Sequence, residues 1–316
     1  MKRWVLAGTV SLGAAVVAVL TFGMWKRSDL VDQGNEKTHM EGSIVAGFYD
    51  QGIEDVGFIT LANKHVTARK MAGSRVLYDV AYTTGPDHFR IVPEVNQAQR
   101  CVLLFGDSLT FGEGVNDEET SAAQIVTRSK GRVAAKSLGI GGWGPHQFLA
   151  GIQSGRFQRA ISCQPSDAVY LFIPAHAGRA AGRGRWDKHG PLFRLDSNGR
   201  PVRAGNFNTG GTSWRELFGL NRLTEDEEED LSTALITEAG REIRHLYPGI
   251  RFHVFTWEGT TTSMIRRLSE RSLHAHTIRE ILPDFSDAYL IAPPLEGHPT
   301  PRAYERIADY FLTLGR

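Results

Sequence analysis

The chain has 316 residues, and its 36 Lys and Arg against 35 Asp and Glu give a formal net charge of +1 at pH 7. Charged residues make up 22% of the chain and apolar residues 41%, a balance typical of a folded globular protein. The near-zero net charge excludes the class of strongly basic proteins that bind nucleic acid through their overall field. The length fits one large domain, alone or with a smaller one.

An uncharged stretch near the amino terminus, residues 4–25, lies between the basic pairs at positions 2–3 and 26–27. It is long enough to cross a bilayer as a helix. No clear Ala-x-Ala cleavage site follows it. We therefore expect residues 1–27 to be a transmembrane signal anchor that holds an exported protein at the membrane; secretion after signal cleavage is the alternative.

Residues 28–97 are predicted to form a polar linker followed by a small β-rich segment. Short pieces typical of strands, separated by turn residues, cover residues 43–46, 56–61, 76–83 and 89–92. The role of this segment stays open at this point: it could pack on the next domain, form part of the active site, or act as a spacer above the membrane.

Buried-strand patterns alternate with helical ones from residue 98 to the end of the chain. Apolar runs that end in turn residues predict buried parallel strands over 102–105, 133–139, 167–174 and 251–257, with a last short strand over 288–291. Helices are predicted over 117–129, 225–245, 262–273 and 302–314. The alternation predicts an α/β fold for residues 98–316, a three-layer α/β/α sandwich with a mainly parallel, flavodoxin-like sheet.

An insertion over residues 178–205 interrupts this alternation. Its first half is rich in arginine and glycine, and its second half predicts a hairpin that turns at Asn198 and Gly199. The basic half could bind an anionic substrate or could be a solvated loop.

The two cysteines, Cys101 and Cys163, each stand just before a predicted strand. If those strands are neighbours, the cysteines could form a disulfide; two buried free thiols are the alternative. The chain has no Cys-x-x-Cys, and His274 and His276 lack a supporting carboxylate or cysteine pattern. We therefore expect no metal and no cofactor.

The sequence Gly106-Asp107-Ser108 follows the first buried strand, at the sheet edge where reacting groups gather in open α/β folds. A serine there can present its hydroxyl to a substrate, and the backbone N–H groups after it can face a developing negative charge. A plain turn is the alternative, since all three residue types are common in turns. The chain holds no Gly-x-Ser-x-Gly, which disfavours the α/β-hydrolase nucleophile elbow.

With Leu109, this sequence resembles the first block of the GDSL, or SGNH, hydrolase superfamily, and the resemblance extends over residues 101–316. It implies that Ser108 is a nucleophile. The superfamily's second block supplies an oxyanion-binding glycine, a place that Gly142 takes here, with Gly141 as the alternative. The usual Asn before that block is Ser137.

The third block of the superfamily carries an oxyanion-binding Asn followed by Asp. Aligning the strands puts residues 174–177 on this block, so that His176 replaces the Asn and Ala177 replaces the Asp. A histidine can also donate an N–H, and we expect His176 to be the third oxyanion donor. A histidine that merely lines the end of the strand is the alternative.

A Gly-His-Pro turn before the final helix supplies the expected base, His298, which can take the proton from Ser108. The superfamily usually places an Asp three residues before this histidine, a position held here by Leu295. The nearest carboxylate is Glu296, which we expect to orient the histidine. Two further carboxylates are fallback candidates, Asp284 and Asp287.

The resemblance implies a serine esterase that acts through a Ser-His-Glu triad and an acyl-enzyme. From the predicted location and the breadth of the superfamily, we expect O-acyl groups on envelope or extracellular glycans as substrates, on the periplasmic or extracellular side of the membrane. An O-acyltransferase with the same triad and a catalytically impaired binding module are the alternatives. No nucleic-acid partner is expected.

Overall fold

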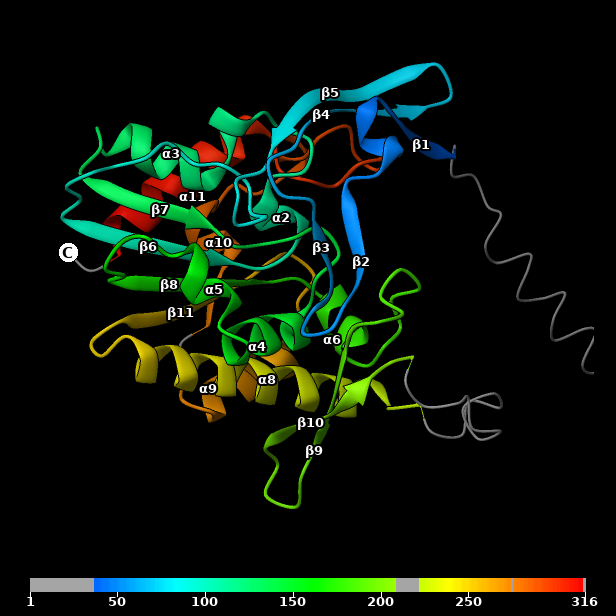
Figure 1. The fold of residues 1–316 in the computed structure, drawn as a ribbon, viewed down its shortest axis with the longest axis vertical. Helices are drawn as coiled ribbons and strands as arrows, with labels where there is room; N and C mark the ends of the chain where they lie inside the picture. Colours follow the sequence, from blue (N-terminus) through cyan, green and yellow to red (C-terminus); the bar gives the residue numbers. More distant parts are fainter. Residues whose placement is uncertain (1–36, 209–221, 274, 315–316) are drawn as a thin grey trace, which may run out of the picture.

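A computed structural model describes residues 37–208, 222–273 and 275–314, and its central feature is a five-stranded parallel sheet (Figure 1). The strand order is β7-β6-β8-β11-β12, which becomes 2-1-3-4-5 when the strands are numbered along the chain, the flavodoxin-like order. These strands are β6 (Arg100–Phe105), β7 (Val133–Ser137), β8 (Asp167–Phe172), β11 (Arg251–Thr256) and β12 (Ala275–Thr277). The predicted parallel α/β fold is confirmed.

Helices cover both faces of this sheet (Figure 1). One face carries α3 (Ser121–Arg128), α10 (Ile278–Ile281) and α11 (Pro301–Thr313). The other face carries α4 (Pro145–Gln153), α5 (Arg156–Ala160) and α8 (Glu225–Leu246), with α9 (Thr262–Glu270) packed against α8.

The central strand β6 is buried on both faces, which explains the unbroken apolar run in its sequence. Successive side chains of a strand point to opposite faces. Val102 and Leu104 belong to the core under α3 and α11, whereas Leu103 and Phe105 belong to the core under α4 and α8. Both faces are buried from Cys101 onward, so residues 101–105 of β6 are all apolar and Ser108 follows a strand that is buried on both faces.

The amino-terminal segment forms two small antiparallel sheets that pack on the α/β domain. One has the order β1-β4-β5 and the other is the pair β2-β3. The strands are β1 (Thr38–Glu41), β2 (Tyr49–Ile53), β3 (Gly57–Thr60), β4 (His65–Ala72) and β5 (Arg75–Thr83). Phe48, just before β2, and Tyr82 of β5 contact Phe111 of the short helix α2 (Ser108–Phe111), with ring centroids 6.1 and 5.2 Å apart.

One buried arginine, Arg90, ties this segment to the chain that follows Ser108. Its guanidinium donates to the carbonyls of Phe111, Gly112 and Val115, and to the carboxylate of Asp117 at 2.8 Å. Because these carbonyls lie at and just beyond the end of α2, the segment supports the helix that begins at Ser108.

Three predicted strands are wrong. Residues 89–92 form no strand, and among them Arg90 alone makes an isolated antiparallel bridge, to Thr84. Residues 43–46 form an exposed 3-10 turn, η1 (Ser43–Ala46), because the flanking Gly42 and Gly47 have φ of +92° and +118°, which bends the chain away from extended geometry. Residues 288–291 make only an isolated antiparallel bridge, from Leu290 to Pro299, after η3 (Asp287–Tyr289). The fifth strand of the sheet is β12 instead.

The helix predicted over residues 117–129 is formed by a short helix η2 (Asp117–Glu119) followed by α3. The helices α4, α5 and α6 (Ala175–Ala180), the last directly after β8, have no counterpart in the prediction. The predicted hairpin is formed by β9 (Pro191–Leu195) and β10 (Pro201–Asn206), and Gly199 in its turn has φ +71°.

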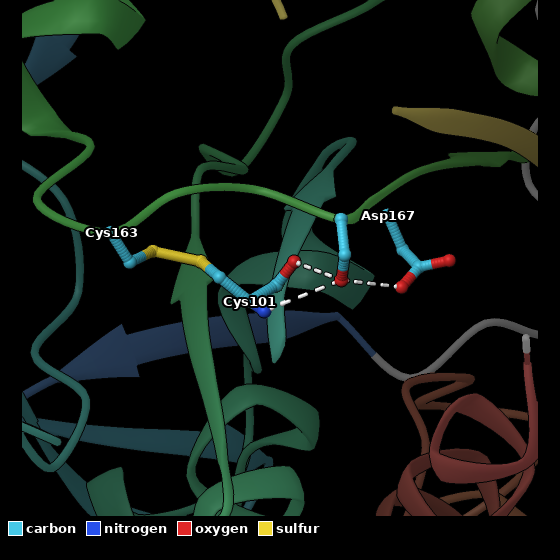
Figure 2. The surroundings of a disulfide bond; sticks show 4 residues. Cys101, Cys163 and Asp167 are labelled. Atoms are coloured by element: carbon cyan, nitrogen blue, oxygen red, sulfur yellow. Dashed lines mark hydrogen bonds between the residues drawn. A yellow bond between two sulfur atoms is a disulfide. The ribbon is translucent and has the colours of Figure 1, made fainter. Parts of the chain in front are cut away.

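The two cysteines, Cys101 and Cys163, form a disulfide at the amino-terminal ends of β6 and β8 (Figure 2). The hydroxyl of Ser166 lies between the backbone of Cys101 and the carboxylate of Asp167, and it donates to that carboxylate at 2.8 Å. This end of the sheet is opposite the end that carries Ser108, so the disulfide braces the scaffold without touching the site.

No helix in residues 37–208, 222–273 and 275–314 is both long enough and apolar enough to cross a membrane. The predicted anchor over residues 4–25 lies outside the described residues.

Candidate active site

Ser108, the predicted nucleophile, is the first residue of α2, the short helix that follows the turn after β6. Gly106 makes the turn possible, because its φ is +152° and a Cβ there would lie 2.4 Å from Thr110 Oγ1. The carboxylate of Asp107 caps α2 by accepting from the N–H of Leu109 at 3.1 Å.

The structure brings the three predicted triad residues together. His298 Nε2 lies 2.8 Å from Ser108 Oγ, and His298 Nδ1 is hydrogen-bonded to Glu296 Oε1. The same Glu296 oxygen accepts from the backbone N–H of His298 at 2.9 Å, which holds the carboxylate under the ring. With Nδ1 donating to a carboxylate, Nε2 of the neutral imidazole is left to accept the Ser108 proton. This is the arrangement that general-base activation of a hydroxyl requires.

The two fallback carboxylates lie elsewhere in the carboxyl-terminal loop. Asp284 accepts from the Tyr289 hydroxyl at 3.1 Å, and Asp287 begins η3. Neither is paired with His298 in the described part of the chain.

The charges around the triad suit a basic histidine. Burial alone would raise the pKa of the Glu296 carboxyl, but hydrogen bonds from His298 and Lys70 lower it to about 2. Burial would lower the pKa of the His298 imidazole, yet the carboxylates of Glu113 and Glu296 raise it above its ordinary value of 6.5. At neutral pH Glu296 is therefore ionised and able to stabilise an imidazolium.

Three residues beside the triad were missed by the sequence analysis. Lys70, on β4, forms an ion pair with Glu296 and lies 3.8 Å from Glu113. Glu113 Oε2 is 3.6 Å from His298 Nε2, and its other oxygen accepts from the Tyr78 hydroxyl at 3.1 Å. Only Glu113 left a signal in the sequence, because it directly follows the nucleophile motif. Lys70 and Tyr78 lie on strands whose contact with the site depends on the tertiary fold.

The glycine loop after β7 lies beside Ser108, with Gly141 adjacent to it. A Cβ on Gly141 would lie 3.9 Å from Ser108 Cβ, whereas the three atoms nearest to a Cβ on Gly142 all belong to the indole of Trp186. Within the described residues, neither glycine N–H donates to a protein acceptor. Both amides are therefore available, and Gly141, the alternative in the sequence analysis, is the one placed next to the serine.

The predicted role of His176 as an oxyanion donor is not supported by its position. Its side chain is fully buried, with Nδ1 3.1 Å from the Tyr170 hydroxyl and Nε2 3.3 Å from Asp107 Oδ2. The ring therefore faces the back of the Gly-Asp-Ser turn instead of the Ser108 hydroxyl. Burial also lowers the pKa of His176, which favours the neutral ring.

Arg179 supplies the cation that Asp107 needs. Its guanidinium donates to Asp107 Oδ2 at 2.7 Å and to the Trp143 carbonyl at 2.8 Å. Burial alone would raise the pKa of Asp107, but its contacts with His176 and Arg179 keep it well below the usual range. Asp107 is thus an ionised, buried anchor that fixes the Gly-Asp-Ser turn.

The insertion over residues 178–205 is anchored close to this site. Asp187 is buried and accepts from Gln147 at 2.5 Å, and it lies 2.8 Å from Nε2 of the buried His146. Arg183 forms an ion pair with Glu228 of α8. Arg183 is thus paired within the protein, as is Arg179 with Asp107, so these two arginines of the insertion are neutralised before any anionic substrate binds.

The cluster of Glu113, Glu296 and His298 is the one group of side chains in the described residues with metal-ligand spacing, its donor atoms all lying within 4.8 Å of one another. The ammonium of Lys70 already contacts both carboxylates, and His298 Nε2 is committed to Ser108. The arrangement therefore fits a charge-balanced triad better than a divalent cation.

No family model and no curated protein matches the chain. Among solved structures, it is similar to a member of the lipolytic protein G-D-S-L family from Veillonella parvula, with 13% identity, a TM-score of 0.38, and coverage of 68% of this chain and 98% of that one. It is also similar to a psychrotrophic esterase from Pseudoalteromonas sp., with 13% identity, a TM-score of 0.38, and coverage of 68% and 95%.

A third similar structure is a catalytic mutant of an acetylxylan esterase from Geobacillus stearothermophilus, with 13% identity, a TM-score of 0.35, and coverage of 69% of this chain and 95% of that one. The neighbours thus include esterases, and the family named for the Veillonella protein is the one that residues 106–109 resemble in sequence.

Proposed function

We propose that the protein is a serine esterase in which Ser108 attacks the carbonyl of an O-acyl ester. The observation that carries the proposal is the continuous hydrogen-bonded series from Ser108 Oγ through His298 to Glu296. Such a series activates a hydroxyl that is otherwise a weak nucleophile at neutral pH.

The proposed reaction has two halves. In the first, Ser108 Oγ bonds to the carbonyl carbon while His298 Nε2 takes its proton, and the tetrahedral oxyanion faces the N–H groups of Ser108 and Gly141 or Gly142. The intermediate collapses, and the alcohol leaves with the proton from His298. In the second half, His298 deprotonates a water molecule that attacks the acyl-enzyme. The bond to Ser108 Oγ then breaks, the oxygen takes the proton back from His298, and the carboxylic acid is released. An acceptor hydroxyl in place of that water would make the protein an acyltransferase.

A sugar is the proposed alcohol half of the ester. Trp186 supports this, because it is 51% exposed although it is held in place beside the glycine loop. Its Nε1 donates to the Gly142 carbonyl at 3.2 Å, and the guanidinium of Arg179 lies 5.6 Å from its ring centroid. A fixed, exposed indole beside the glycine loop can stack against the apolar C–H face of a sugar ring.

An exported, membrane-anchored location is part of the proposal. It rests on the uncharged stretch over residues 4–25, and the disulfide between Cys101 and Cys163 agrees with an oxidising compartment. A binding module without activity is the weaker proposal, because such a module would not need the Ser108–His298 pairing.

The test is a panel of acyl esters, offered to the parent protein and to Ser108→Ala with and without oligosaccharide acceptors. Ser108-dependent release of acid without an acceptor would support the hydrolase, and transfer to the sugar would favour the acyltransferase. Ester turnover that Ser108→Ala retains in full would contradict the proposal.

A further inference from the structure

The proposed reaction calls for a donor to the oxyanion besides the backbone N–H groups. The donor expected from the sequence, His176, is buried behind Asp107. The amino-terminal segment brings a different side chain, Tyr49 of β2, to the glycine loop beside Ser108.

The Tyr49 hydroxyl lies on the side of Gly141 that faces the nucleophile. A Cβ placed on Gly141 would lie 2.9 Å from the Tyr49 hydroxyl oxygen, 3.9 Å from Ser108 Cβ and 3.9 Å from Glu113 Oε2. The hydroxyl, the serine and the carboxylate therefore surround one small volume next to the glycine loop. An ester carbonyl attacked by Ser108 must direct its oxygen toward this loop if the loop N–H groups are to bind it.

The Tyr49 ring is held firmly while its hydroxyl is not engaged. Phe48 and Phe58 pack edge-on against the ring, with centroids 5.3 and 5.9 Å away, and Tyr49 is paired with Thr60 of β3. Within the described residues, the hydroxyl has no hydrogen-bond partner, and the residue is 36% exposed. A fixed ring with an unengaged O–H is a preorganised donor, which loses little entropy on binding.

Its protonation state suits this role. Burial raises the pKa of the Tyr49 phenol, and the negative charge of Glu113 raises it further. The hydroxyl therefore keeps its proton at neutral pH and can donate it in a hydrogen bond.

We infer that the Tyr49 hydroxyl donates a hydrogen bond to the oxyanion of the tetrahedral intermediate, taking the place that the buried His176 cannot fill. The proton stays on the phenol, and no bond to Tyr49 forms or breaks. The inference rests on the proposed esterase function. It makes the amino-terminal segment part of the catalytic machinery, since Tyr49 touches the reacting oxygen.

The experiment compares Tyr49→Phe with the parent protein on p-nitrophenyl acetate. The variant keeps the ring and its packing and removes only the hydroxyl. An oxyanion donor acts in the transition state, so kcat should fall about 10- to 100-fold with KM nearly unchanged, a range scaled down from buried oxyanion donors. Binding of a trifluoromethyl ketone, which forms a tetrahedral adduct with Ser108, should weaken by a similar factor.

The matched control is Tyr247→Phe, which also removes a phenol hydroxyl, at the distant carboxyl-terminal end of α8, and should leave both measurements unchanged. A fall in kcat without weaker ketone binding would overturn the inference, as would a change in KM alone or full activity of Tyr49→Phe. Absence of Ser108-dependent turnover in the parent protein would instead overturn the proposed function, and the inference with it.

Discussion

Ser108, His298 and Glu296 come from two segments 190 residues apart that end at the same edge of the sheet. Sequence reasoning could place them because each lies in a short motif with its own chemistry: a turn after a buried strand and a Gly-His-Pro turn before a helix. It could not place Lys70 or Tyr49, because nothing in their local sequence reports a contact made across the fold. His176 was misjudged because strand alignment gives a position along the chain and not the direction of a side chain.

The first prediction concerns the acid of the triad. Glu296→Gln should lower kcat at least about tenfold, because His298 loses the carboxylate that fixes its tautomer and stabilises its charged form. The matched control is Asp284→Asn, whose carboxylate serves Tyr289 and not His298. Steady-state kinetics on p-nitrophenyl acetate measure both variants. Full activity of Glu296→Gln together with a loss in Asp284→Asn would mean that the acid is misassigned.

The second prediction concerns the pH dependence of activity. His298 must be neutral to accept the Ser108 proton. Burial lowers the pKa of its imidazole, but the carboxylates of Glu113 and Glu296 outweigh burial and raise the pKa above 6.5. Activity should therefore fall as pH drops through a value above 6.5. Glu113→Gln removes one of these negative charges, so the acid limb of the kcat/KM profile should move to lower pH. An acid limb that stays in place, or moves upward, would show that Glu113 does not act on His298.

At the scale of elements, the amino-terminal segment was recognised as β-rich but its role was left open. Strand β5 was predicted almost at its true bounds, whereas β4 was not predicted, because its exposed positions carry His65, Thr67 and Arg69 and its apolar positions are small. The catalytic domain was easier to predict, because strands buried on both faces leave unbroken apolar runs. A segment that covers an active site needs only a few contact residues, and these give no periodic signal.

The third prediction tests how firmly this segment is joined to α2. Arg90→Met would leave buried carbonyls without donors, at a cost of roughly 1–3 kcal/mol for each one that water cannot reach. We expect the free energy of unfolding to fall by at least about 3 kcal/mol. Equilibrium denaturation in urea measures this. Arg69→Met removes an exposed ion pair between β4 and β5, with Asp79, and should leave the free energy of unfolding nearly unchanged. Equal effects of the two variants would contradict the structural role of Arg90.

At the scale of the whole molecule, the triad and the disulfide lie at opposite ends of the central sheet. The site occupies the carboxyl ends of the strands, and the disulfide joins Cys101 and Cys163 at the amino ends (Figure 2). The strand order places β6 between β7 and β8, so Cys101 at the start of β6 and Cys163 just before β8 are neighbours. The sequence could offer this pairing only as one of two alternatives, because strand order is a property of the fold.

The fourth prediction follows from that separation. The disulfide closes a loop of 62 residues, and cross-linking a loop of this size stabilises a domain by about 4 kcal/mol through the unfolded state. The double variant Cys101→Ala/Cys163→Ala should therefore be less stable by about that amount. Its kcat at a temperature where it is folded should match the parent value. A large loss of kcat in the folded variant would show that the two ends of the sheet are coupled.

The most direct test of the account is covalent trapping of the nucleophile. A fluorophosphonate reacts with a serine only when its hydroxyl is activated. Intact mass spectrometry of the parent protein should show one adduct, Ser108→Ala should show none, and His298→Ala should react far more slowly. Equal labelling of the parent protein and Ser108→Ala, or no labelling of either, would contradict the assignment of Ser108 as the activated nucleophile.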